Sequence, residues 1–240
     1  MNDDLREFLA RARGTAATAK VIRLDELTRT TRDEAPWGLP ALRGRIVELS
    51  ARGASGTLTC ATSLVFEAQS EGEPVAWIVP WCVDPDTRGG SDVRTPGTFY
   101  PPDAADSGVD LSALVVVRAP SVIAAGRAAE RLLRSGAFGL VVIDFGSSNL
   151  EATSARISDA MLGRLVSLAQ ANDAAIVCLT EKTRDAGSLG SLVSLRVEAL
   201  RERAEGARSS DFEVTVRALK DKRRGPGWSR ALKARGPSGL

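Results

Sequence analysis

The sequence predicts an α/β fold with a mostly parallel, twisted sheet, flanking helices and antiparallel strands at the C-terminal edge. Short apolar runs without polar alternation are typical of strands buried on both faces of a parallel sheet. Five such runs occur, at 46–49, 75–79, 114–117, 140–143 and 175–179. Helical periodicity is found at 122–134 and 154–171, between such runs. Apolar and polar residues then alternate over 195–199 and 212–218, which predicts half-exposed antiparallel strands after the parallel crossovers.

Composition excludes several classes of protein. The 240 residues are 43% hydrophobic and 26% charged, which is the balance of a globular protein and excludes a chain that is disordered throughout. No histidine occurs, so Ser-His-Asp triads, Cys-His pairs and histidine-ligated metal sites are excluded. Cys60, Cys82 and Cys178 are far apart, which indicates neither a zinc site nor a disulfide framework. Cys60 and Cys178 lie in apolar runs, as core thiols do.

Charge and hydropathy indicate where the protein acts. No apolar stretch approaches the roughly 18–20 residues that cross a bilayer. The N-terminus carries Asp3, Asp4 and Glu7 rather than the basic region of a signal peptide. We therefore expect a cytoplasmic protein that makes no membrane contact. The net charge is only +2, but residues 217–240 hold eight Lys or Arg against one Asp, so the basic character is concentrated at the C-terminus.

The domain organisation is expected to have three parts. Residues 1–36 form an N-terminal helix and arm, residues 37–219 form the core domain, and residues 220–240 form a basic, flexible tail. The N-terminal helix is too short to be stable alone. Its apolar face must therefore pack either on another protein or back on the core of its own chain. That face consists of Leu5, Phe8 and Leu9.

The turn after the first predicted strand has the shape of a phosphate-binding loop. Residues 45–59 read as a strand, a run of small residues and the start of a helix, which is the arrangement whose backbone N–H groups cradle phosphates. On the pattern G-x-x-x-x-G-K-[ST], Gly56 remains, but the first glycine becomes Ala51, the lysine becomes Thr57 and the metal-binding hydroxyl becomes Leu58. The cation and the metal ligand that neutralise the phosphates are therefore absent.

A carboxylate follows a later predicted strand. The apolar run 140–143 ends in Asp144, as does the strand that carries the Mg²⁺-associated carboxylate of P-loop proteins, although such an Asp is also commonly a turn cap. Together with the loop, it predicts the remnant of a nucleotide site, with no catalytic residue, no cofactor and no metal. The residues of this remnant are Gly53, Ser55, Gly56, Thr57 and Asp144.

These segments resemble the bacterial recombinase family RecA. The similarity covers roughly residues 20–222 and is carried by 21–24, 38–49, 108–111 and 128–144, with a weaker match at 213–222 that includes Lys220 and Lys222. It implies a RecA-like core domain. The resemblance fails at the catalytic positions, because residues 78–82 lack the glutamate that activates water in RecA, and residues 180–182 lack its phosphate-sensing glutamine. The chain is therefore expected to be neither an enzyme nor a working recombinase.

A short RecA-like chain with a degraded phosphate loop and a basic extension is similar to the ImuA family, the RecA-like accessory proteins of the bacterial mutasome. That resemblance implies a role in SOS-induced mutagenesis and translesion DNA synthesis, with ImuB, an error-prone DNA polymerase and RecA as partners. In RecA the N-terminal helix packs on a neighbouring subunit, so the arm residues Leu5, Phe8 and Leu9 are implied to contact RecA or a second copy of this chain. Two other classes stay open. One is an unconventional nucleotide hydrolase that uses Asp144 for Mg²⁺, and the other is a DNA-binding module.

The predicted tail combines cations with apolar residues. Its cations can neutralise nucleic-acid phosphates, and its indole can stack on a base. Alternatively, Trp228 and Leu232 are spaced i, i+4 and would form one stripe of a helix that folds on a protein partner. A merely solvated tail is the third possibility, and we expect removal of residues 217–240 to leave the fold intact. The candidate contact residues are Lys220, Lys222, Arg223, Arg224, Trp228, Arg230, Leu232 and Lys233.

Overall fold

The computed structural model describes residues 37–53, 55–80, 99–146, 157–203 and 211–235. The chain divides into two compact units, residues 1–35 and 36–240, and every described residue belongs to the second. The predicted N-terminal arm, with Leu5, Phe8 and Leu9, lies outside the described residues. None of the helices in the described part of the chain is long and apolar enough to span a membrane.

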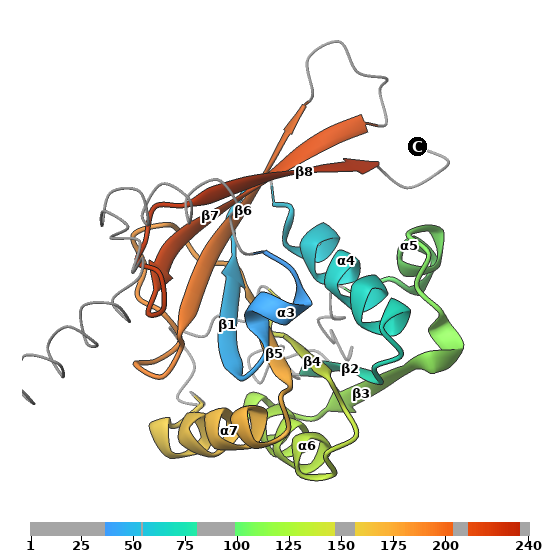
Figure 1. The fold of residues 1–240 in the computed structure, drawn as a ribbon, viewed down its shortest axis with the longest axis vertical. Helices are drawn as coiled ribbons and strands as arrows, with labels where there is room; N and C mark the ends of the chain where they lie inside the picture. The colour runs from blue at the N-terminus through green and yellow to red at the C-terminus, as the bar shows by residue number, and fades with distance from the viewer. Residues whose placement is uncertain (1–36, 54, 81–98, 147–156, 204–210, 236–240) are drawn as a thin grey trace, which may run out of the picture. The chain divides into compact units, whose positions relative to one another are not determined.

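The predicted fold class is confirmed by one eight-stranded sheet with the order β3-β2-β4-β5-β1-β6-β7-β8 (Figure 1). The six strands from β3 to β6 pair in parallel, and β7 and β8 pair antiparallel at the C-terminal edge. The strands are β1 Arg45–Ser50, β2 Val75–Pro80, β3 Leu114–Ala119, β4 Leu140–Asp144, β5 Ala175–Thr180, β6 Leu195–Arg203, β7 Asp211–Asp221 and β8 Ser229–Arg235.

Helices cover both faces of the sheet. Helices α3, α4 and α5 contribute to the core on one face, whereas α6 and α7 pack on the other (Figure 1). The predicted helix at 122–134 is confirmed, but the next helix begins at Asp159 because the Ser158 hydroxyl caps it by accepting the Met161 N–H at 3.2 Å. The helices are α3 Leu39–Leu42, α4 Thr57–Ser70, α5 Pro101–Asp106, the 3₁₀ turn η1 Leu111–Ala113, α6 Val122–Arg134 and α7 Asp159–Ala171.

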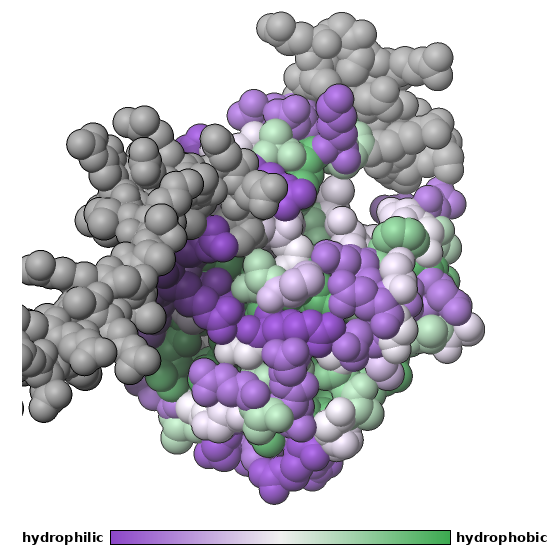
Figure 2. Space-filling model, viewed as in Figure 1, coloured by the Kyte–Doolittle hydropathy of each residue, from purple (hydrophilic) through white to green (hydrophobic). Residues whose placement is uncertain are grey.

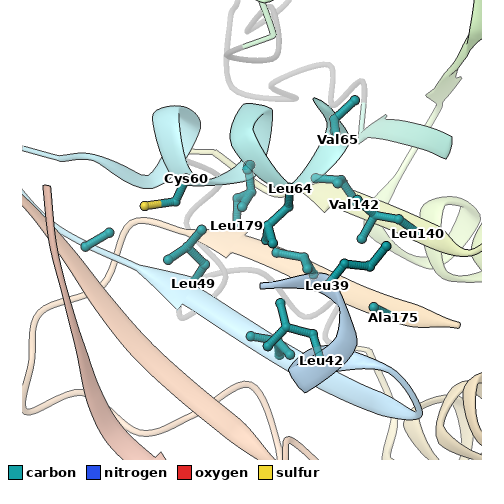
Figure 3. Packing of buried hydrophobic residues seen from close by; sticks show 14 of the residues in the cluster. Leu39, Leu42, Leu49, Cys60, Leu64, Val65, Leu140, Val142, Ala175 and Leu179 are labelled. Carbon is teal, nitrogen blue, oxygen red and sulfur yellow. The ribbon is translucent and has the colours of Figure 1, made fainter. Parts of the chain in front are cut away.

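The core on the α4 face is built from aliphatic side chains of the strands and of two helices. Leu64 of α4 and Leu39 of α3 lie over Leu49 of β1 and Val142 of β4 (Figure 3). Cys60, on α4, is fully buried in the same cluster, and Cys178 is buried on the opposite face, so both are core thiols as predicted. Hydrophilic residues cover much of the described surface seen in Figure 2, with apolar residues interspersed.

Two predicted burial patterns are wrong, and strand order explains both. The apolar run of β3 predicts burial on both faces, but the strand lies at the sheet edge, where Val115 and Val116 remain 43% and 42% exposed. The alternation in β6 predicts half exposure, but the strand lies between β1 and β7, where Arg196 and Glu198 are only 5% and 9% exposed. The local sequence encodes the strand, whereas its neighbours decide its burial.

The prediction of a flexible tail is also wrong for residues 220–235. β7 continues to Asp221, and residues 229–235 form β8, which pairs along β7 from Arg217–Ser229 to Asp211–Arg235. Trp228 and Leu232 are partly buried against the core on the α4 face. They therefore pack at the edge of the sheet and do not form one stripe of a helix. The C-terminal segment is therefore part of the folded domain as far as Arg235.

Candidate functional site

The loop between β1 and α4 has the predicted strand–loop–helix geometry, but its backbone is bound by the chain itself. The N–H of Gly56 donates to the carbonyl of Ala199 on β6 at 3.0 Å. Ser55 forms an isolated antiparallel bridge with Leu200 of the same strand. A Cβ atom on Gly56 would lie 2.4 Å from Cγ1 of Val214, so β7 packs directly against this glycine. The loop is therefore bound to β6 and β7 through the part of its backbone that would contact the ligand in a phosphate-binding loop.

The first N–H of α4 is also occupied. The Thr57 N–H donates to the Ser55 hydroxyl at 3.2 Å, and the two side-chain oxygens lie 2.8 Å apart. Leu58, at the position of the metal-binding hydroxyl, is 37% exposed. A helix N-terminus binds an anion through free N–H groups. Here the Gly56 and Thr57 N–H groups already have acceptors, so an anion would have to displace them.

Asp144 lies at the same edge of the sheet as the loop. Asp144 and Leu49 both lie beside Leu179 of β5, from opposite sides, so the ends of β4 and β1 flank one strand. The Asp144 side chain is almost fully buried, and its Oδ1 accepts the Gly146 N–H at 3.1 Å. This contact is the turn cap that was the alternative to a metal-binding role. Gly53 has φ of +87°, and a Cβ atom added there would have no neighbour within 4 Å, so this glycine serves the turn.

A buried charged cluster next to the loop was missed by sequence reasoning. Glu48, in the middle of β1, is fully buried and forms an ion pair with Lys182 at 3.1 Å. Its carboxylate also accepts the Thr180 hydroxyl at 3.1 Å and the Leu189 N–H at 2.8 Å. A lone glutamate inside an apolar strand was the available signal, because a buried carboxylate requires partners.

The cations predicted as a contact surface are partly engaged within the domain. Lys220 donates to the Ser188 hydroxyl at 3.3 Å, and Lys222 donates to the Ser191 carbonyl at 2.6 Å. Burial, together with the charges of Lys222 and Arg196, lowers the pKa of Lys220. Arg223 donates to the Arg43 carbonyl at 3.3 Å, and Arg230 donates to the Trp37 carbonyl at 2.7 Å. The side chains of Lys222, Arg223, Arg224, Arg230 and Lys233 nevertheless remain exposed.

The structure places the predicted nucleotide-site remnant and the basic turn with Lys222, Arg223 and Arg224 at opposite ends of β1. The phosphate-loop remnant follows Ser50 at the carboxyl end, whereas the turn that carries Lys222, Arg223 and Arg224 follows Asp221, which pairs with Arg45 at the amino end. The turn cations therefore do not complete the nucleotide-site remnant within one chain.

Comparison with known proteins gives one informative similarity. No protein-family model matches the chain. Protein RecA from a Nocardioides species is 34% identical over 135 residues, which is 52% of this chain and 34% of that RecA. The chain has a RecA-like relationship. It matches only about a third of the length of this relative, and its mostly parallel sheet with antiparallel edge strands is consistent with a RecA-like core.

Proposed function

We propose that the protein is a non-catalytic RecA-like adaptor or regulator in SOS-induced mutagenesis and translesion DNA synthesis, of the ImuA type. The proposal that the protein is non-catalytic rests on the Gly56 N–H, which donates to the carbonyl of Ala199. Val214 fills the space beside the same glycine. A nucleotide would need this N–H together with a lysine and a hydroxyl that Thr57 and Leu58 do not provide.

The exposed edge of the sheet supports a role in protein contacts. In the described part of the chain, β3 pairs with β2 alone, and it carries the exposed Val115 and Val116. Ile123, at the start of α6, is 44% exposed. An open, apolar strand edge is a site at which another chain can add a strand. We propose this edge as a contact for RecA or ImuB, with the arm residues Leu5, Phe8 and Leu9 as a second contact.

The nucleotide question is tested by calorimetric titration with Mg·ATP and a non-hydrolysable analogue. Three proteins are compared: the wild type, Asp144→Ala, and the double variant Thr57→Lys/Leu58→Thr, which restores the missing side chains. We expect no saturable binding at millimolar nucleotide in any of them, because the Gly56 N–H stays bound to the Ala199 carbonyl. Saturable binding to the wild type that disappears in Asp144→Ala would overturn the non-catalytic assignment and favour an unconventional hydrolase.

The partner question is tested by biolayer interferometry with immobilised RecA and, separately, ImuB. Val116→Lys places a charge on the β3 edge, and Leu58→Lys places the same charge at a similarly exposed residue of α4. We expect Val116→Lys to weaken binding at least tenfold and Leu58→Lys to leave it unchanged. Equal binding by both variants would remove the β3 edge from the proposal.

A DNA-binding module is the second candidate, favoured by the three exposed cations Lys222, Arg223 and Arg224 on one turn. Fluorescence anisotropy with a labelled single-stranded oligonucleotide tests it. Binding that falls steeply with salt and is lost in the triple alanine variant of the turn would favour DNA contact. The control is Lys233→Ala, which removes one exposed cation from β8 and leaves the turn intact.

A further inference from the structure

The β5–β6 loop, residues 181–194, is held against the sheet by charged side chains from three strands. Glu48 of β1 accepts the Leu189 N–H, Arg196 of β6 donates to the carbonyls of Thr183 and Ala186, and Lys220 of β7 donates to the Ser188 hydroxyl. These strands are neighbours, in the order β1-β6-β7. The loop is therefore hydrogen-bonded to three adjacent strands.

Glu48 is the anion at the centre of these contacts. Its Oε1 accepts from the Lys182 ammonium and the Thr180 hydroxyl, both at 3.1 Å, and its Oε2 accepts the Leu189 N–H at 2.8 Å. An ammonium, a hydroxyl and a backbone N–H together are the donors that proteins use for a bound phosphate or carboxylate ligand. Here the anion is supplied by the chain and has no access to solvent.

Lys182 connects this anion to the rest of the loop. Its Nζ donates to the Gly187 carbonyl at 3.1 Å as well as to Glu48, and its side chain is only 10% exposed. On the α7 side, a Cβ atom on Gly190 would lie 2.5 Å from Cδ1 of Leu162, so the loop also packs tightly on that helix. Without the carboxylate, Lys182 would be a buried cation with only a neutral partner, and Leu189 would lose its acceptor.

We propose that Glu48 is an internal anion that keeps the β5–β6 loop closed on the sheet without a bound ligand. The closed loop presents Thr183, Arg184 and Asp185 to solvent in a fixed arrangement, whatever nucleotide is present. This goes beyond the proposed function, because it states which group of the chain orders a surface loop and makes its conformation independent of ligands.

Hydrogen–deuterium exchange of the full chain tests the proposal. Glu48→Gln keeps the size of the side chain and removes its charge. We expect exchange across residues 183–191 to become at least tenfold faster, while exchange in α6 stays unchanged, and we expect Mg·ATP to have no effect on the wild-type loop. Unchanged protection of residues 183–191 in a folded Glu48→Gln protein would overturn the proposal.

A second variant covers the case in which Glu48→Gln fails to fold. In Glu48→Gln/Lys182→Met both members of the buried ion pair lose their charge, so the domain is expected to fold while the loop still exchanges at least tenfold faster. A folded double variant with wild-type protection of the loop would also overturn the proposal. These exchange measurements on the variants use no nucleotide. Nucleotide binding by the wild type would therefore contradict the proposed function without changing their outcome.

Discussion

Arg45 donates to Asp221 at 2.6 Å, so that the first residue of β1 is joined to the last residue of β7 across 176 positions of sequence. Both side chains are buried, with 3% and 0% of their surfaces exposed. Arg45 also donates to the hydroxyl and carbonyl of Ser194, and Asp221 accepts the Trp228 indole N–H at 3.1 Å. This one pair therefore connects β1, the entry to β6, the end of β7 and the turn into β8.

Removal of the Asp221 charge is expected to destabilise the domain. In Asp221→Ala, the buried Arg45 loses its counter-ion and Trp228 loses its acceptor, so we expect the free energy of unfolding to fall by about 3–5 kcal/mol. Urea unfolding followed by tryptophan fluorescence measures the change. Asp185→Ala, on the exposed surface of the β5–β6 loop, is the matched control and is expected to change stability by less than about 0.5 kcal/mol. Equal unfolding midpoints for the two variants would contradict this role for the pair.

The same pair predicts a loss of stability in acid. Burial raises the pKa of Asp221, but the Arg223 N–H, the Arg45 guanidinium and the Trp228 indole together outweigh burial and hold it below its usual value. Burial lowers the pKa of Arg45, against the charge of Asp221, but an arginine stays protonated throughout the acid range. A carboxyl whose pKa is lower in the folded state stabilises that state above the unfolded pKa of about 3.9, and this contribution is lost as the pH falls through the folded pKa.

The measurement for this prediction is urea unfolding of the wild type and Asp221→Asn between pH 7 and pH 3. We expect the difference in free energy of unfolding between the two proteins to be largest near neutral pH and to shrink below about pH 4. A difference that is constant over the whole range would show that the ionisation of Asp221 does not contribute.

Gly56→Ala is expected to destabilise the domain through a steric clash. The new methyl group would lie 2.4 Å from Cγ1 of the fully buried Val214, and overpacking of this kind costs about 1–3 kcal/mol. The control is Gly163→Ala inside α7, where the nearest atom is 3.7 Å away, and it is expected to be neutral or stabilising. A double-mutant cycle with Val214→Ala measures the coupling directly, and additive effects would contradict the contact between the loop and β7.

Truncation after Val216 is expected to abolish cooperative unfolding, in contrast to the prediction from sequence that the fold survives. The deletion removes β8, the end of β7, Asp221 and the partly buried Trp228 and Leu232. A chain that ends at Arg235 keeps all of these and is the matched control. Circular dichroism during heating compares the two chains. A cooperative transition at the same temperature in both would show that residues 217–235 are dispensable for folding.

Both described cysteines are expected to resist alkylation. Burial raises the pKa of the Cys60 thiol to about 12, and burial together with the nearby Glu48 raises that of Cys178 further. Because the thiolate is the reactive form, iodoacetamide at pH 8 is expected to leave both residues unmodified in the folded protein and to modify both in urea. Peptide mapping by mass spectrometry reports each cysteine separately. Rapid modification of Cys60 in the native protein would show that α4 opens.

Much of the fold could be predicted from local pattern. The apolar runs located β1, β2, β4 and β5 to within a residue or two, and the helical stripe located α6 at both ends. The structure places the phosphate-loop remnant and Asp144 at one edge of the sheet, because the carboxyl ends of the parallel strands β1 and β4 share an edge. The Glu48 cluster could not be predicted in detail, because Lys182 and Leu189 reach it only through the path of the β5–β6 loop.

The sequence by itself determined the parallel strands, helix α6 and the loss of the phosphate-binding side chains, since Thr57 and Leu58 can be read directly where a lysine and a hydroxyl are needed. Tertiary structure alone decided which strands are edges, that residues 229–235 join the sheet, and that Ala199 and Val214 occupy the loop around Gly56. The reason is physical: periodicity reports which face of an element is apolar, whereas the pairing and packing of elements depend on contacts between different segments of the chain, such as that of Gly56 with Ala199.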